Sequence, residues 1–177
     1  MRARPALAYI VALWCFVGLV GCKTSPDGSS SEPGVAASAT SATKKADPHV
    51  HFEPAPPGDL AAIVQSAVSK AQADGRRLVV YEGATWCEPC QRFHAAVAAG
   101  QLDATFPDLT FLELDADRDR DRIIAAGYSS EYIPLFALPG KDGRAAGPKA
   151  SGGIKGDGAV AYLTNKLKML LAQGTGS

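Results

Sequence analysis

Apolar positions recur along the chain at two different spacings, which predicts both helices and strands. Between residues 60 and 75, apolar side chains return every three or four positions, as on the buried face of a helix. Asp59 directly precedes this pattern and is expected to cap the helix, and Gly75 ends it. Residues 77–83 then carry the apolar run LVVY, which is typical of a buried strand.

The same two spacings alternate through the rest of the chain. The expected elements are a helix at residues 87–99, a strand at 109–114, a short helix around Ile123, a strand at 132–138, a weak edge strand after a turn at 140–143, and a closing helix at 157–172. Helices and strands that alternate in this way favour an α/β domain in which helices cover a sheet.

The first part of the chain has the pattern of an export signal. Arg2 and Arg4 precede an uncharged run over residues 6–20, which is too short to span a membrane comfortably. The run ends in LVGC, which resembles the lipobox of bacterial lipoproteins. That resemblance implies a signal peptide at residues 1–21 and several acyl chains on Cys22, enough to hold the protein on a membrane. An uncleaved signal anchor with an incidental cysteine is the alternative.

The composition changes between this signal and the first expected helix. Residues 23–57 are rich in Ser, Thr, Ala, Pro and Gly with almost no large apolar side chain, so they cannot bury enough surface to fold. We predict a disordered tether over residues 22–57, with a reach of roughly 30–35 Å, and a folded domain over residues 58–177. His49 and His51 fall in this tether, and we interpret them as part of an extended edge rather than as a metal site.

Composition and charge narrow the range of functions. The chain has 177 residues, 46% of them hydrophobic, and a formal net charge of zero, which suits one folded domain with appendages. The sequence has no basic stripe interleaved with aromatic residues, so we expect no nucleic-acid partner. We expect a monomer.

The four cysteines fall into two groups. Cys15 and Cys22 lie near the N-terminus, so Cys87 and Cys90 are the only pair in the expected domain. Outside the cytosol, such a lone pair is better explained by catalysis than by a structural disulfide.

The spacing of Cys87 and Cys90 suits reversible disulfide chemistry. Two intervening residues, wound into the first turn of a helix, bring the sulfurs close enough to form and break one disulfide. Cys87 would then lie where unpaired helix N–H groups favour a thiolate, the nucleophile of disulfide exchange. Pro89 fits the first helical turn, where its missing N–H costs little, and it stiffens the loop between the sulfurs.

The sequence WCEPC at residues 86–90, directly after a predicted strand, resembles the active site of the thioredoxin superfamily. The resemblance extends over about residues 58–173. It implies an α/β thioredoxin fold, with a central mixed sheet of about four strands flanked by helices. It also implies a protein-disulfide oxidoreductase without a cofactor, in which Cys87 attacks a disulfide of the partner protein and Cys90 resolves the mixed disulfide.

The resemblance also assigns roles to residues around the sulfurs. Pro134 matches, by its order along the chain and its place at the head of a strand, the cis-proline that lies against the active-site disulfide in this family. The backbone of Ile133 would hold the partner's chain, and Trp86 would shield one side. An ordinary trans-proline at a strand's first residue is the alternative.

The chain departs from the family pattern at two positions near the cysteines. Thioredoxins carry a buried Asp six residues before the first cysteine, a position that is Tyr81 here. The neighbouring Glu82 would face the opposite side of a regular strand, and both residues remain open candidates for proton transfer. Glu88 opposes a thiolate by about 1 kcal/mol or less, which nearly cancels the roughly 0.3–1 kcal/mol available from the helix terminus. We therefore expect a redox pair nearer to the reducing end of the family.

The sequence as a whole predicts a lipid-anchored thiol–disulfide oxidoreductase of the bacterial cell envelope, facing the periplasm or the exterior. Its partners would be disulfide-bonded envelope proteins and a thiol electron donor. The alternative is a metal-binding chaperone for copper(I) or another thiophilic metal, in which Cys87, Cys90 and His94, one helical turn beyond, are the ligands. The intact cysteine pair argues against a third possibility, an adaptor without chemistry.

Overall fold

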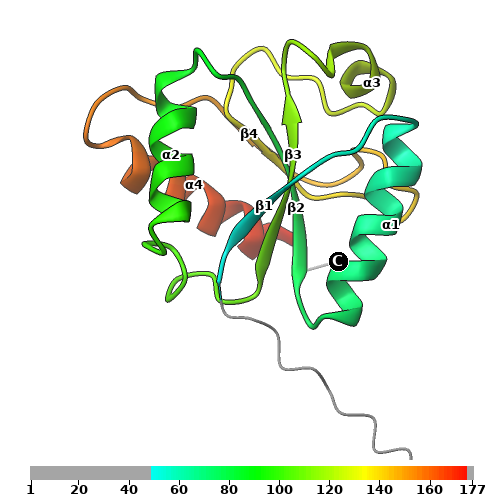
Figure 1. Cartoon of the computed structure of the whole chain (residues 1–177), viewed down its shortest axis with the longest axis horizontal. Helices are drawn as coiled ribbons and strands as arrows, with labels where there is room; N and C mark the ends of the chain where they lie inside the picture. The colour runs from blue at the N-terminus through cyan, green and yellow to red at the C-terminus, as the bar shows by residue number, and fades with distance from the viewer. Residues whose placement is uncertain (1–48, 175–177) are drawn as a thin grey trace, which may run out of the picture. The chain divides into compact units, whose positions relative to one another are not determined.

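The computed structural model describes residues 49–174, which form a sheet with helices on both faces (Figure 1). The predicted signal peptide, Cys22 and most of the predicted tether lie outside the described residues. Within residues 49–174, no helix combines the length and the apolar character that crossing a bilayer requires.

The sheet has five strands in the order β1-β3-β2-β4-β5. The elements along the chain are β1 (His51–Pro54), α1 (Leu60–Ala73), β2 (Arg77–Gly83), α2 (Glu88–Ala98), β3 (Leu109–Asp115), α3 (Arg120–Ala125), β4 (Leu135–Ala137), β5 (Lys149–Ser151) and α4 (Ala159–Gly174). Strands β1, β3 and β2 are parallel, whereas β4 and β5 run antiparallel to their neighbours. The sheet is therefore mixed, as the resemblance implies.

Strand β1 lies before the predicted start of the folded domain and corrects that boundary. Its residues were expected to belong to the disordered tether, yet they pair with β3, with Phe52 opposite Phe111. The Phe52 ring stacks on the Phe111 ring with centroids 4.9 Å apart, and Val50 is fully buried. The ordered part of the chain thus includes residues 49–57, because a few apolar side chains in a polar segment find partners on the edge of the sheet.

The remaining elements lie where the apolar spacings predict them, with one shortened strand. The Asp59 carboxylate caps α1 by accepting the Ala61 N–H at 3.1 Å, and the helix ends before Gly75, whose φ of 69° suits glycine. Strand β4 begins only at Leu135, whereas the sequence predicts a strand from residue 132. Pro134 has no N–H to donate to a neighbouring strand, which explains the later start.

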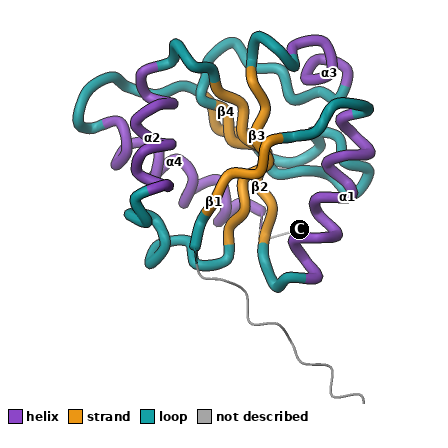
Figure 2. Tube along the Cα trace, in the orientation of Figure 1, coloured by secondary structure: helices purple, strands orange, loops and turns teal. Residues whose placement is uncertain are grey.

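The sheet separates two layers of helices, with α2 and α4 on one face and α1 and α3 on the other (Figures 1 and 2). Alternate side chains of β2 belong to the two faces. Val79 and Tyr81 pack in the core on the α2–α4 face, and Leu78 and Val80 pack in the core on the α1–α3 face. Both cysteines belong to the first of these cores.

Candidate functional site

Cys87 and Cys90 are joined by a disulfide bond at the start of α2, with their Cα atoms 5.2 Å apart. Cys87 is the N-cap residue, and its Sγ accepts the backbone N–H of Cys90 at 3.3 Å. A donor at this position and the positive end of the helix both favour negative charge on the Cys87 sulfur once the bond is reduced. Both residues are largely buried, with exposed fractions of 6% for Cys87 and 2% for Cys90.

The segment that holds Pro134 lies against the first turn of α2. The Ile133–Pro134 peptide bond is cis, and Ile133 packs on the core cluster that contains both cysteines. Gly153 lies between the two prolines, because a Cβ atom placed there would be 2.8 Å from Cβ of Pro89 and 3.4 Å from Cδ of Pro134. A glycine at this position thus lets the proline between the cysteines approach the proline that heads β4.

Trp86 is 66% exposed, yet its orientation is fixed. Its indole Nε1 donates a hydrogen bond of 2.8 Å to the Asp117 carboxylate, from the loop between β3 and α3. A groove of about 380 Å³ extends from Trp86 to Ile133, so the two residues expected to contact a partner lie on one continuous surface.

Glu88, between the cysteines, is an ion-pair partner rather than an isolated charge. Its carboxylate accepts hydrogen bonds from the Arg92 side chain and, at 3.2 Å, from the Gly156 N–H. The Arg92 hydrogen bond is the main reason that the pKa of Glu88 lies below its usual value. Partial desolvation raises this pKa, and the hydrogen bond from Gly156 lowers it further. The repulsion between this carboxylate and a Cys87 thiolate is correspondingly weakened.

Tyr81 and Glu82 project to opposite faces of β2, because the strand pairs with β3 in continuous register. Tyr81 is fully buried on the face of the cysteines, and burial raises the pKa of its phenol, as does the charge of Glu113. Burial raises the pKa of Glu82 to about 7, partly opposed by Lys149. Glu82 borders the groove beside Trp86 instead of the space behind Cys90.

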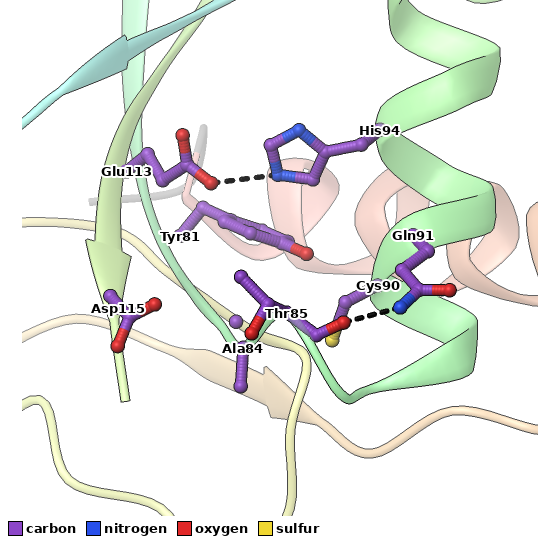
Figure 3. A pocket seen from close by; sticks show the side chains of 9 residues that line it. Tyr81, Ala84, Thr85, Cys90, Gln91, His94, Glu113 and Asp115 are labelled. Atoms are coloured by element: carbon purple, nitrogen blue, oxygen red, sulfur yellow. Dashed lines mark hydrogen bonds and ion pairs between the residues drawn. The ribbon is translucent and has the colours of Figure 1, made fainter. Parts of the chain in front are cut away.

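A cleft of about 460 Å³, lined by both apolar and ionisable side chains, lies behind Cys90 (Figure 3). Its wall includes Tyr81, Thr85, Cys90, His94, Glu113 and Asp115. Glu113 is a site residue that no sequence motif indicates. In the segment LTFLELD, alternate residues face the same side of β3, so Glu113 and Asp115 share the face of Phe111. This alternation was the feature of the sequence that could have placed both residues near the cysteines.

His94 shares the cavity with Cys90, but its ring is held by other partners. Its Nε2 lies 2.8 Å from Oε1 of Glu113, and its ring stacks on Phe52 with centroids 3.8 Å apart. Within residues 49–174, no group of three or more His, Cys, Asp or Glu side chains is arranged to hold a metal ion. The ligand set of the chaperone alternative is therefore not assembled in this structure.

Proteins of similar sequence decide the family. A thioredoxin H-type of Picea mariana is 35% identical over 103 residues, covering 58% of this chain and 74% of that protein. A thioredoxin H-type of Oryza sativa subsp. indica is 36% identical over 90 residues, covering 51% and 69%. The chain belongs to the thioredoxin family.

Solved thioredoxin structures also match part of this chain. A Fasciola hepatica thioredoxin is 26% identical with a TM-score of 0.44, and the match covers 64% of this chain and 93% of that one. A poplar thioredoxin h is 24% identical with a TM-score of 0.44, and the match covers 70% and 96%. No protein-family profile matches the chain. The predicted thioredoxin fold and enzyme class are confirmed, and the protein is a thioredoxin-like thiol–disulfide oxidoreductase.

Proposed function

We propose that this thioredoxin-family protein is a lipid-anchored enzyme of the bacterial cell envelope that reduces or exchanges disulfide bonds in envelope proteins. The observation that carries the proposal is the Cys87–Cys90 disulfide at the N-terminus of α2, with the Cys87 sulfur accepting a backbone N–H. This arrangement supplies an activated nucleophile and a second thiol within reach of it. The two sulfurs carry the electrons, so no cofactor is required.

In the proposed reaction, the Cys87 thiolate attacks one sulfur of a disulfide in the partner protein. A mixed disulfide forms, and the other sulfur of the partner leaves as a thiolate. Cys90 then loses its proton and attacks the Cys87 sulfur, which releases the second sulfur of the partner and regenerates the Cys87–Cys90 disulfide. A thiol electron donor returns two electrons and two protons to start the next cycle.

Residues beside the sulfurs would position the partner protein. The backbone of Ile133, ahead of the cis bond to Pro134, is available to pair with an extended segment of the partner, and Trp86 would shield one side of it. The groove between Trp86 and Ile133 supports this assignment. Of the two candidates for proton transfer, Tyr81 borders the cavity that reaches Cys90, whereas Glu82 lies on the other face of the sheet.

The reducing direction follows from the modest stabilisation available to the Cys87 thiolate. A helix N-terminus contributes roughly 0.3–1 kcal/mol, well below what a strongly oxidising pair requires of its reduced form. Glu88 supplies no stabilisation of its own, because its carboxylate is negative and Arg92 only reduces the repulsion. We therefore propose that electrons flow from the protein to its substrates.

The proposed location rests on the sequence of the N-terminal segment. A signal peptide at residues 1–21 would be removed, Cys22 would carry the acyl chains, and the residues up to about 48 would tether the domain as a monomer. Detergent fractionation tests the anchor, because Cys22→Ser should move the protein out of the membrane fraction. A Cys22→Ser variant that stays in the membrane fraction would contradict the lipid anchor.

Reduction of insulin by the full-length protein in detergent, with dithiothreitol as donor, tests the chemistry. We expect rapid insulin precipitation, its loss in Cys87→Ser, and an accumulating mixed disulfide with insulin in Cys90→Ser. Cys22→Ser is the matched control and should keep wild-type activity. Stoichiometric copper(I) binding without insulin reduction would instead favour the chaperone alternative.

A further inference from the structure

Cys90 is shielded from solvent, so its thiol cannot release a proton directly to bulk water. Cys90 is 2% exposed, and burial in apolar surroundings disfavours a thiolate. The proposed resolving step nevertheless requires the Cys90 thiol to lose its proton before its sulfur attacks. The cleft behind Cys90, with a volume of about 460 Å³ and four ionisable side chains besides Cys90 on its wall, is large enough for several water molecules and offers a route for that proton.

Tyr81 directs an unpartnered hydroxyl group into the same region. The side chain is fully buried, and its Oη has no hydrogen-bond partner among residues 49–174. The hydroxyl lies over Gly83, where an added Cβ atom would be 2.7 Å from the Oη. A residue with a side chain at that position would therefore displace the phenol. Because burial raises the pKa of Tyr81, the hydroxyl keeps its proton and acts as a donor.

The His94–Glu113 pair forms another part of the cavity wall. The ion-pair contact of 2.8 Å joins α2 to β3, and Glu113 is in register with Tyr81 on β2. The imidazole is further held by stacking on Phe52 and by an edge contact with Tyr81, with centroids 5.5 Å apart. Histidine is the side chain type best suited to exchanging a proton near neutral pH. The pair is thus held in place on the wall of the same cleft that reaches the buried Cys90 thiol.

The other ionisable group on the cavity wall is Asp115. Its Oδ1 accepts the backbone N–H groups of Asp117 and Arg118 at 3.0 and 2.9 Å. Because these contacts commit Asp115 to the loop after β3, we assign it no part in proton exchange. Glu82 projects to the opposite face of the sheet and does not line the cavity.

We propose that the Cys90 thiol loses its proton through this cleft during the resolving step, and we call the cleft with Tyr81, His94 and Glu113 the proton port. The Tyr81 hydroxyl donates a hydrogen bond to the Cys90 thiolate. The His94–Glu113 pair takes up the proton. The proton leaves the Cys90 thiol through the cleft and is taken up between Nε2 of His94 and Oε1 of Glu113, which lie 2.8 Å apart. The Cys90 sulfur then bonds to the Cys87 sulfur, and the partner's sulfur departs as a thiolate that takes a proton from solvent. The step deepens the proposed function and rests on it.

A two-phase assay with an aromatic disulfide, 5,5′-dithiobis(2-nitrobenzoate), tests this port. Attack by Cys87 releases the first coloured thiolate, and resolution by Cys90 releases the second, so stopped-flow absorbance separates the two steps. All variants are made in full-length protein carrying Cys15→Ser and Cys22→Ser, which leaves Cys87 and Cys90 as the only thiols. Both phases are recorded as functions of pH.

We expect Tyr81→Phe to slow the second phase at least about tenfold near neutral pH and to move its pH profile upward by about one unit, because a tenfold change corresponds to one pKa unit. His94→Gln and Glu113→Gln should slow the second phase and flatten its pH dependence. The first phase should stay within about twofold of the parent protein in all three variants. A second phase that is slowed without any change in its pH profile would indicate a packing defect and overturn the proposal.

Two matched variants control for burial and for loss of a histidine. Tyr128→Phe removes a buried hydroxyl on the other face of the sheet, and His51→Gln removes an imidazole from β1. Both should leave the two phases unchanged. A normal second phase in Tyr81→Phe and His94→Gln, with the first phase intact, would overturn the port but not disulfide exchange by Cys87. Absence of the first phase in the parent protein would overturn the proposed function and the port together.

Discussion

Tyr81 and Glu82 are neighbours on β2, yet they show two different fates of a buried polar group. Each has a side-chain oxygen without a hydrogen-bond partner among the described residues, the Oη of Tyr81 and the Oε2 of Glu82. The Tyr81 side chain borders the cleft that also reaches Cys90, His94 and Glu113. Glu82 is in register with Leu114 and Leu135, both fully buried, and its carboxyl group is forced toward its neutral form. An unpartnered buried oxygen thus belongs to the proposed proton transfer on one face of the sheet. On the other face it makes the stability of the protein depend on pH.

The two faces also differ in the side chains that fill them. On the side of the cysteines, an aromatic cluster is formed by Phe52, Tyr81, Phe93, Phe111 and Phe136. The α1–α3 side is filled mainly by aliphatic side chains. Aromatic side chains each bury a large area and pair in specific ring geometries. The difference predicts that the aromatic side tolerates truncation less well and transmits it to the redox pair.

The largest effect should come from truncating the centre of the aromatic cluster. Phe93 is fully buried against Phe111 and Phe136, so Phe93→Ala should lower the free energy of unfolding by about 3–5 kcal/mol and raise the reactivity of Cys90 toward alkylation in the reduced protein. Leu114→Ala on the aliphatic side should cost about 2–5 kcal/mol without changing that reactivity. Urea denaturation and thiol alkylation measure the two quantities. Equal alkylation rates in both variants would remove the distinction between the faces.

The next effect concerns Glu82 and has a definite sign. Its folded-state pKa of about 7 lies above the ordinary value of 4.5, so the folded protein binds a proton more tightly than the unfolded chain. The stabilisation from this group is complete below the unfolded pKa and is lost as the pH rises through the folded pKa, at about 1.4 kcal/mol per unit and about 3 kcal/mol in total. Glu82→Gln should abolish that part of the pH dependence. Chemical denaturation of both proteins between about pH 4 and 8 provides the measurement, and identical slopes would show that Glu82 is not desolvated.

The smallest effect should come from the Tyr81 hydroxyl. An unpartnered buried hydroxyl is unfavourable, so Tyr81→Phe should leave the free energy of unfolding unchanged or raise it by about 1 kcal/mol. Tyr128→Phe is the contrasting case, because its hydroxyl donates to the Gly143 carbonyl at 2.9 Å and its loss should cost about 0.5–1.5 kcal/mol. Thermal melting of the oxidised proteins checks both. A clear loss of stability in Tyr81→Phe would mean that the hydroxyl has a stabilising partner.

Local patterns in the sequence were sufficient to locate the cysteine pair and most of the elements around it. Cysteine spacing, a proline in the first turn and a preceding apolar run all lie within residues 78–94, so no long-range information was needed. The site beyond the sulfurs depends on long-range pairing. The cavity combines Tyr81, His94 and Glu113 from three elements, and strand register cannot be obtained from the alternation of one strand alone.

Strand β1 was missed for a related reason. Its four residues, HFEP, adjoin a Pro-rich segment, and average composition over such a segment hides two or three apolar side chains. Their burial becomes evident only when β3 is present as a neighbour. Glu88 illustrates the same limit, because its pairing with Arg92 is available from helical spacing, whereas its contact with Gly156 brings in a distant loop.

The parallel pairing of β1 determines where the chain enters the domain. Strands β1 and β2 run in the same direction, and the disulfide follows the C-terminal end of β2. Residue 49, just before β1, therefore lies at the opposite end of the sheet (Figure 1). The two ends of the sheet are about 20 Å apart, the length of the seven residues of β2. The described part of the chain therefore begins at the end of the sheet away from the disulfide, so residues 49–54 leave the approach to the sulfurs open.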